Sequence, residues 1–412
     1  MQKFDLLIIG GGMVGLTLAL ATRKLTDLSV AIVDSQPIQP LDSEPELRVS
    51  AINAASQNIF QQLDVWQDML DSRGQTYHQM HVWDKAGYGK LNFTDERLDA
   101  EQLGFILENK VVRNALWQKA EQDAGIAFFT EEKITNLAFG DTEVFAAFSQ
   151  QPPITAKLVV GADGANSWLR QQLDVGMAFR DYNHHAMVAT VKCSQGHQDT
   201  AWQVFLPTGP LAFLPLYQHP EHSQQLCSIV WSSAPEDIAR LKRLSCEQFN
   251  REITAACDGK LGTVELISEL QSYPLTMRLA HDFYYKKAVL IGDAAHTIHP
   301  LAGQGVNLGL IDAVALAETL AELTSSGRAI TDEAALKAYA RWRKSDASEM
   351  IAAMEAIKQV FASRTDAIDT PLQVLRGIGM SLIDAATPVK DGLIKQALGY
   401  KGKMPSLAKA QR

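Results

Sequence analysis

The residues most able to hold a phosphorylated ligand lie in a glycine-rich turn near the start of the chain. The sequence Gly10-Gly11-Gly12-Met13-Val14-Gly15 fits the pattern G-x-G-x-x-G. It stands between the apolar run Phe4–Ile9, which is typical of a buried parallel strand, and a helix-compatible stretch. In this pattern Gly10 permits a tight turn, Gly12 lets a pyrophosphate approach the backbone, and Gly15 lets the helix pack on the strand. The helix start then presents unpaired N–H groups to the phosphates.

An acidic residue follows at the distance that a dinucleotide site requires. The apolar run Val30–Val33 ends in Asp34, 24 residues after Gly10. A carboxylate in this place accepts hydrogen bonds from an adenosine ribose. The two features together predict dinucleotide binding, but they do not choose between FAD and NAD.

Two later turns also place an aspartate directly after a strand-like run. Leu158-Val159-Val160 leads into Gly161-Ala162-Asp163-Gly164, and Ala288-Val289-Leu290-Ile291 leads into Gly292-Asp293-Ala294-Ala295-His296. Ligands of open α/β sheets gather at the carboxyl ends of strands, where such turns lie. Taken alone, each aspartate is equally well explained as a helix cap or a turn former.

The longest motif is His299-Pro300-Leu301-Ala302-Gly303-Gln304-Gly305-Val306-Asn307-Leu308-Gly309, with Asp312 three residues further on. Proline and small residues predict a tight loop that opens a helix reaching about Leu323. The start of such a helix offers N–H groups and a positive dipole end to an anionic ring edge. Preorganised donors of this kind stabilise charge without a general base.

The order and spacing of these motifs resemble the aromatic-ring flavoprotein hydroxylases, and the long loop resembles in particular the ubiquinone-biosynthesis hydroxylases. The resemblance extends from Phe4 to about Tyr400 and includes Arg48–Ser56 and Gly161–Arg170. It implies FAD as cofactor, NADH or NADPH as electron donor, and hydroxylation by O₂ through a C4a-hydroperoxyflavin. The resemblance is strongest to members that hydroxylate a 2-polyprenylphenol at ring C5, which is called position 6 in phenol naming. Sibling enzymes acting at another ring position share every flavin motif.

The resemblance also assigns roles to individual residues. It implies that the turn of Asp163 touches the pyrophosphate, that Asp293 holds the ribityl chain, and that Arg48 and Arg113 contact the flavin side. The expected FAD-binding residues are Gly10, Gly12, Gly15, Asp34, Arg48, Arg113, Asp163, Gly292, Asp293, Gln304, Gly305, Val306 and Asn307. The expected catalytic element is the backbone of the loop at Pro300, Gly303 and Gly305, with no side-chain base.

We expect an α/β fold in three parts. A discontinuous Rossmann-like FAD domain takes residues 1–75, 105–180 and 282–340, and a helical C-terminal region takes 341–412. A mostly antiparallel β-sheet substrate domain takes 76–104 and 181–281, where strand-like segments follow one another. Its candidate pocket residues are Trp202, Phe205, Phe213 and Pro215, for which a place in the sheet core is an equally good interpretation.

Composition excludes several classes of function. The net charge of −9 and the isoelectric point near 5.6 argue against nucleic acid as a partner. The four cysteines form no C-x-x-C pair, and His296-x-x-His299 lacks further ligands, so we expect reduced thiols and no metal. No apolar run reaches about 18 residues, and no signal peptide is recognisable, so we expect a cytoplasmic protein without a transmembrane helix.

The last part of the chain is basic. From Pro371 to the end there are seven Lys or Arg residues and two Asp residues. A polyprenylphenol partitions into the bilayer, so such a tail could hold the protein peripherally at the inner membrane. The alternative is that helices of this region pack on the FAD domain.

Two further functions fit the same flavin motifs. One is hydroxylation of small soluble phenols. The second is a role as a flavin-bound assembly subunit that works with other ubiquinone-biosynthesis proteins and has little turnover of its own.

Overall fold

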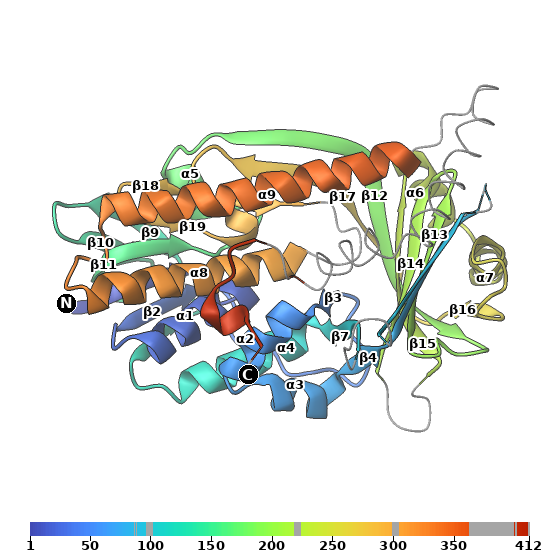
Figure 1. The fold of residues 1–412 in the computed structure, drawn as a ribbon, viewed down its shortest axis with the longest axis horizontal. Coiled ribbons are helices and arrows are strands. Elements are labelled where there is room, and N and C mark those ends of the chain that lie inside the picture. Colours follow the sequence, from blue (N-terminus) through green and yellow to red (C-terminus); the bar gives the residue numbers. More distant parts are fainter. Residues whose placement is uncertain are drawn as a thin grey trace.

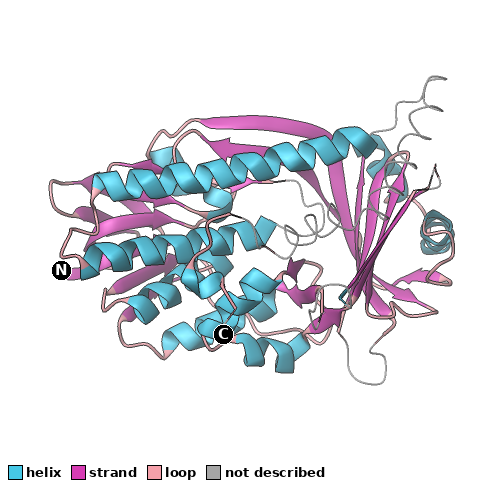
Figure 2. Cartoon of the chain, viewed as in Figure 1, coloured by secondary structure: helices cyan, strands magenta, loops and turns pink. Residues whose placement is uncertain are grey.

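A computed structural model describes residues 1–85, 87, 89–95, 102–217, 224–298, 305–361, 399 and 402–410, with only the backbone path of 357–361. Three sheets organise the chain (Figure 1). Helices gather around the eight-stranded sheet, whereas the nine-stranded sheet forms most of the opposite end of the molecule (Figure 2). The expected fold class is therefore confirmed.

The eight-stranded sheet is built on a parallel centre. Its strands are β1 (Gln2–Ile9), β2 (Val30–Asp34), β8 (Ile126–Thr130), β9 (Ile134–Phe139), β10 (Val144–Phe148), β11 (Ile154–Gly161), β18 (Tyr284–Tyr285) and β19 (Ala288–Leu290). The order is β18-β19-β11-β1-β2-β8, with β10 antiparallel to β11 and β9 antiparallel to β10. Leu6, Leu7 and Ile8 are fully buried, which explains why the β1 run is apolar without alternation.

The helices cover this sheet and lie beside its carboxyl edge. They are α1 (Met13–Leu25), α2 (Ala54–Gln62), α3 (Trp66–Arg73), α4 (Asn109–Glu121), α5 (Trp168–Gln172), α8 (Gly305–Ser325) and α9 (Glu333–Phe361). A Cβ on Gly309 of α8 would lie 2.9 Å from the Val14 side chain of α1 and 3.1 Å from the Gly292 backbone. The absent side chain thus lets α8 pack directly against α1 and the turn after β19. No helix in the described part of the chain is long and apolar enough to span a bilayer.

The nine-stranded sheet is antiparallel except where β13 pairs with β5. Its strands are β5 (Gln79–Asp84), β6 (Lys90–Thr94), β12 (Met177–Cys193), β13 (Thr200–Leu206), β14 (Gly209–Pro215), β15 (Leu226–Ser233), β16 (Val264–Leu266), β17 (Gln271–Ala280) and β20 (His296–Thr297). Helices α6 (Pro235–Leu241) and α7 (Cys246–Ala256) pack on one face through Ile238, Phe249 and Ile253. The other face meets the three-stranded sheet of β3 (Val49–Ile52), β4 (Gln75–Tyr77) and β7 (Gly104–Glu108).

The described part of the C-terminal region consists of a long helix and a short final segment. Helix α9 begins at Glu333, ahead of the expected boundary at residue 341. Residues 402–410 contain no α-helix, only the 3-10 turn η4 (Ser406–Ala408), and they pack on the FAD domain. In Figure 1 this turn, drawn in red, lies beside α2.

Candidate functional site

The first glycine turn leaves the start of α1 open. Gly10 has a φ of +110°, and a Cβ there would lie 2.4 Å from the Ala162 backbone oxygen. A Cβ on Gly15 would lie 2.0 Å from the Gly10 oxygen, whereas a Cβ on Gly12 would meet no atom of the described structure within 4 Å. Gly12 is the N-cap of α1, where no side chain caps the helix. The helix start therefore has both the donors and the space that a pyrophosphate needs.

Asp34 and Arg113 meet at the end of β2. The two carboxylate oxygens of Asp34 accept hydrogen bonds from the backbone N–H groups of Gly11 and Gln36, at 2.7 and 2.8 Å. The Arg113 Nε donates to the Gly11 oxygen at 2.8 Å, and its guanidinium lies 3.6 Å from Asp34. Its other nitrogens reach the backbone oxygens of Gln36 and Pro37. Asp34 keeps lone pairs for ribose hydroxyls, whereas Arg113 mainly holds the backbone around the site.

The second turn is joined to the third by a buried arginine. Arg170 donates to the backbone oxygens of Ala165 and Ala294, at 2.9 and 2.8 Å. One oxygen of Asp163 accepts from the Leu169 N–H at 3.2 Å. The other is buried and has no hydrogen-bond partner among the described residues. A buried acceptor of this kind requires an explanation, and a bound ligand supplies one.

The third turn, η2 (Gly292–Ala294), carries Asp293. The Asp293 side chain is exposed to solvent although its neighbours Gly292 and Ala294 are buried. The dense protein around it raises the pKa of the Asp293 carboxyl, and the positive charges of His296, Arg48 and Arg278 oppose that rise. An accessible carboxyl in such surroundings is typical of the wall of a ligand cleft. The structure thus brings Arg48 and Asp293 to one region.

A buried carboxylate on α8 holds this third turn in place. One oxygen of Asp312 accepts from the Gly292 N–H at 3.0 Å and lies 2.6 Å from His296 Nε2. The other oxygen accepts from the Nε of Arg343 on α9 at 2.7 Å, and the Tyr339 hydroxyl donates to the Asp312 backbone oxygen. Burial by itself would raise the pKa of Asp312, but His296 and Arg343 outweigh it and hold that pKa below its ordinary value. The Asp312 carboxylate therefore stays charged, and the turn cannot shift without breaking this cluster.

The first turn of α8 is locked to β3 and α2. The Asn307 side chain donates to the Ala51 oxygen at 2.8 Å and accepts from the Asn53 backbone N–H at 3.2 Å. Both functional groups of the Asn307 side chain are thus used inside the protein, which leaves its backbone for the cofactor. Among the described residues, a Cβ on Gly305 would meet only the Ile298 side chain, at 3.9 Å. Open space at Gly305 fits the close approach of a flat ring.

The structure describes only some of the remaining residues of the predicted loop. Val306 is partly buried against the main core. Pro300, Gly303 and Gln304 lie outside the described residues.

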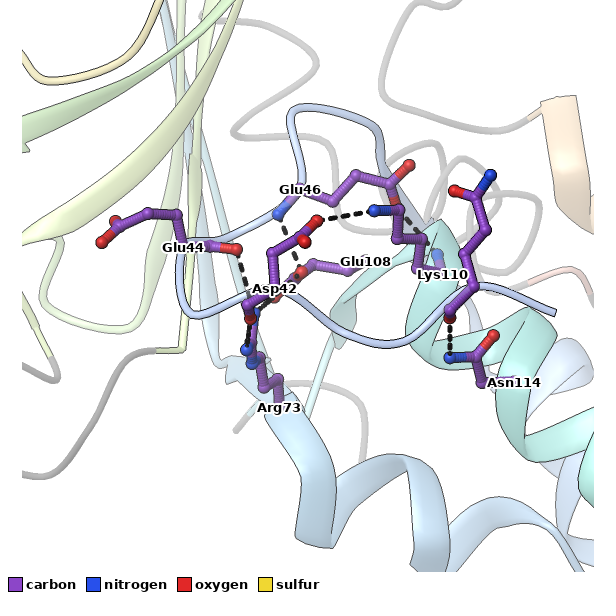
Figure 3. A network of polar contacts seen from close by, with 8 residues as sticks. Asp42, Glu44, Glu46, Arg73, Glu108, Lys110 and Asn114 are labelled. Atoms are coloured by element: carbon purple, nitrogen blue, oxygen red, sulfur yellow. Dashed lines mark hydrogen bonds and ion pairs between the residues drawn. The ribbon is translucent and has the colours of Figure 1, made fainter.

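A polar network holds the loop of Asp42, Glu44 and Glu46, which precedes Arg48 in the chain, against α4 (Figure 3). The Glu46 N–H donates to Glu108 at 2.8 Å, and Glu46 accepts from the Lys110 N–H at 2.7 Å. Lys110 also pairs with Asp42 at 2.7 Å, and Arg73 donates to Glu108 and to the Asp42 backbone oxygen. Burial raises the pKa values of Glu46 and Glu108.

A cavity of about 450 Å³ lies beside this loop, between Arg48, Lys110 and Gln271 of β17. It places Arg48 where the FAD domain meets the nine-stranded sheet. The Arg48 guanidinium carbon lies 6.0 Å from the centre of the Tyr273 ring, which is also on β17.

The four pocket candidates do not share one surface. Trp202 and Phe213 are paired across β13 and β14 and belong to the cluster that faces α6 and α7. Pro215 is buried at the end of β14, opposite Cys227 of the same cluster. Phe205 lies on the other face, with Val82 and Leu91. This arrangement favours the sheet-core interpretation for Trp202 and Phe213.

Sequence inspection missed several arginines that build the site. Arg170 stands in the second motif, so its position was a usable signal. Arg278 of β17 donates to the Ala165 oxygen at 2.8 Å and to the Asn166 side chain at 2.9 Å. Neither Arg278 nor Arg343 stands in a recognisable motif, so only the structure identifies them.

The residues present fit FAD. The uncapped start of α1 suits a pyrophosphate, Asp34 suits a ribose, Asp163 has a free buried acceptor, and Asp293 presents an accessible carboxyl. The start of α8, beside the Asn53 cap of α2, offers backbone donors for a ring that gains negative charge when reduced.

Comparison with known proteins gives the same assignment. Residues 3–354 match a family model described as FAD binding domain. The 3-demethoxyubiquinol 3-hydroxylase of Escherichia coli (strain K12) is 34% identical over 400 residues, covering 97% of this chain and 99% of that protein. Ubiquinone hydroxylase UbiL of Rhodospirillum rubrum is 30% identical, covering 96% of this chain and 89% of that protein.

Solved structures share the fold at lower sequence identity. The p-nitrophenol 4-monooxygenase PnpA from Pseudomonas putida DLL-E4 superposes with a TM-score of 0.77 at 17% identity, covering 98% of this chain and all of that one. PqsL of P. aeruginosa, in complex with 2-aminobenzoylacetate, superposes with a TM-score of 0.76 at 20% identity, covering 92% of this chain and all of that one.

Two glycines of the first turn should separate folding from cofactor binding. The methyl group of Gly12→Ala meets no described atom within 4 Å, so the apoprotein should keep its stability within about 0.5 kcal/mol. FAD binding should weaken by about tenfold or more, because the methyl group occupies the approach of the pyrophosphate. Gly15→Ala forces a contact with the Gly10 oxygen and should lower the free energy of unfolding by about 1–3 kcal/mol. Thermal unfolding measures the stability of each variant, and FAD titration measures its affinity for the cofactor. Full FAD affinity in Gly12→Ala would contradict the assignment of Gly12 to the pyrophosphate site.

The Asp312 cluster should give a distinct acid response. Asp312→Asn leaves Arg343 buried without its main partner and should cost about 3–5 kcal/mol of stability. The folded pKa of Asp312 is lowered, so its contribution is present above about pH 4 and is lost as the pH falls through the folded value. Denaturant unfolding at several pH values should show this acid loss in the wild type and not in the variant. Asp346→Asn, which removes the more exposed partner of Arg343, is the control and should cost less than about 1 kcal/mol. Equal losses in the two variants would refute the special role of Asp312.

Proposed function

The chain belongs to the FAD binding domain family and, within it, to the ubiquinone-biosynthesis hydroxylases, and from this premise we propose that it hydroxylates the aromatic ring of a polyprenylphenol. Its class is FAD-dependent monooxygenase, with NADH or NADPH as co-substrate. The proposal concerns the substrate and the ring position.

The chain's own residues divide the work between holding the cofactor and shaping the reaction space. The α1 start, Asp34 and Asp293 would hold the pyrophosphate, ribose and ribityl parts of FAD. When bound, FAD supplies the redox chemistry, taking electrons from the nicotinamide and activating O₂. The backbone at Gly305 and Asn307 would stabilise negative charge on the ring. The nine-stranded sheet excludes water and orients the phenol.

The observation that carries the substrate class is the apolar surface where the nine-stranded sheet faces the FAD domain. Leu214, Leu216 and Leu226 are buried there with Ala51 of β3 and Ile106 of β7. The side chains at this interface are apolar, which supports a hydrocarbon-bearing substrate. We infer that the pocket lies on this face, to which Phe205 also belongs.

For the ring position we propose the carbon ortho to the hydroxyl of a 2-polyprenylphenol, which is ring C5 and is called position 6 in phenol naming, on the resemblance of the motifs. A second candidate is the activity named for the E. coli relative, 3-demethoxyubiquinol 3-hydroxylation, which its 34% identity favours. An assembly role beside other ubiquinone-biosynthesis proteins is a third, and it predicts FAD binding without turnover.

Product analysis separates these candidates. Deletion of the gene should cause a polyprenylphenol to accumulate, whereas a demethoxyquinone precursor would favour the second candidate. Purified protein with FAD, NADH or NADPH and the polyprenylphenol should form one ring-hydroxylated product, identified by mass spectrometry and NMR. Gly305→Val is the matched control, because it adds a side chain at the α8 start, where the described residues leave room for a Cβ, and it should form no product. FAD binding with no wild-type turnover on any prenylated phenol would support the assembly role instead.

We also propose peripheral membrane contact through the basic residues of the tail. Each Lys or Arg near an anionic leaflet contributes roughly 1 kcal/mol, enough together for reversible attachment. Liposome co-sedimentation should show binding to anionic and not to neutral vesicles. Replacing Arg376, Lys390 and Lys395 by Gln should reduce it. Binding that needs neither anionic lipid nor these charges would overturn the proposal.

A further inference from the structure

The end of the chain packs on the helices that begin at the flavin site. We call Gly399 and residues 402–410 the C-terminal strap. Leu407 is 5% exposed, and Ala408 is fully buried in the main core. The Asn58 side chain of α2 donates to the Ala408 oxygen at 3.1 Å, and Glu318 of α8 accepts from the Ser406 N–H. The strap therefore joins α2 to α8 and is not a free tail.

Gly399 touches the residue that caps α2. Its φ is +84°, and a Cβ there would lie 2.7 Å from the Asn53 side-chain nitrogen and 2.8 Å from the Ala55 Cβ. The side-chain oxygen of Asn53 accepts from the Ser56 N–H at 3.0 Å, which caps α2. Its backbone N–H donates to Asn307 in the first turn of α8. Gly399 is thus connected through Asn53 to Asn307, whose backbone would face the flavin.

We propose that the C-terminal strap is a structural component of the flavin site, and that it positions the starts of α2 and α8 for FAD. At one end of the strap, Gly399 packs against Asn53. At the other end of the strap, Ser406 and Ala408 form hydrogen bonds with Glu318 and Asn58. A site of this kind must hold its donors within a fraction of an ångström, so a support that bridges both helices affects affinity without touching the cofactor. The inference rests on FAD binding alone and not on the identity of the phenol.

A matched pair of glycines tests the contact at Asn53. Gly399 and Gly402 both have positive φ values, +84° and +69°, so an alanine strains the backbone at either position. Only at Gly399 does the methyl group collide with Asn53; at Gly402 it meets no described atom within 4 Å. FAD titration of the apoprotein should show affinity at least about fivefold weaker for Gly399→Ala and changed by less than about twofold for Gly402→Ala. Equal effects, or wild-type affinity in Gly399→Ala, would overturn the proposal.

The far tethers supply a second, independent test. Asn58→Ala and Glu318→Ala each remove one hydrogen bond to the strap, and each should weaken FAD binding by about twofold to tenfold. Glu318→Gln keeps an acceptor for the Ser406 N–H and should bind FAD as the wild type does. Thermal unfolding of each apoprotein should change little, which separates this role from general stability. A loss of apoprotein stability with unchanged FAD affinity would assign the strap to the core alone.

A third test adds the strap as a separate peptide to a truncated chain. A chain ending at residue 398 should bind FAD weakly, and a synthetic peptide of residues 399–412 should restore the affinity and the shape of the visible flavin spectrum. A truncated protein that binds FAD as tightly as the full chain would refute the inference. If the truncated chain does not fold, the Glu318→Ala and Glu318→Gln pair decides the matter.

Discussion

The buried carboxylate of Asp312 is the interaction on which the flavin end of the molecule depends. A charge without solvent must be compensated by nearby donors, and these come from three separate segments. Gly292 and His296 belong to the turn and strand after β19, and Arg343 belongs to α9. One side chain thus fixes the turn that carries Asp293, the axis of α8 and the packing of α9.

The second constraint is the close approach of backbone to backbone. Gly15 packs on Gly10, and Gly309 lets α8 lie against α1 and Gly292. Side chains at these positions would separate the helices and move their N-termini away from a common ligand. Gly12 and Gly305 differ from this group, because no described atom lies closer than 3.9 Å to a Cβ at either position. Packing and ligand approach therefore use different glycines within the same motifs.

The two faces of the nine-stranded sheet pack against different partners. The face with Phe213 and Trp202 packs against α6 and α7 and builds a separate core. The face with Leu214 and Leu226 closes on the FAD domain through β3 and β7. The core on the α6 and α7 face is therefore separate from the contacts that join the sheet to the FAD domain.

The sequence by itself determined the features that are local in the chain. Strand, turn and helix around Gly10–Gly15, the acid at Asp34, and the starts of η2 and α8 all follow from short motifs with a direct physical reason. The sequence left Trp202 and Phe213 open between pocket and sheet core, and the packing of α6 and α7 on their face favours the core. The pairing of Asp312 with Arg343, and the bridge of Arg170 to Ala294, join segments whose proximity no spacing rule supplies. The basic composition of the tail likewise did not reveal the strap, because its partners on α2 lie more than 300 residues earlier. Only tertiary packing brings such distant groups together and decides which of them carry the site.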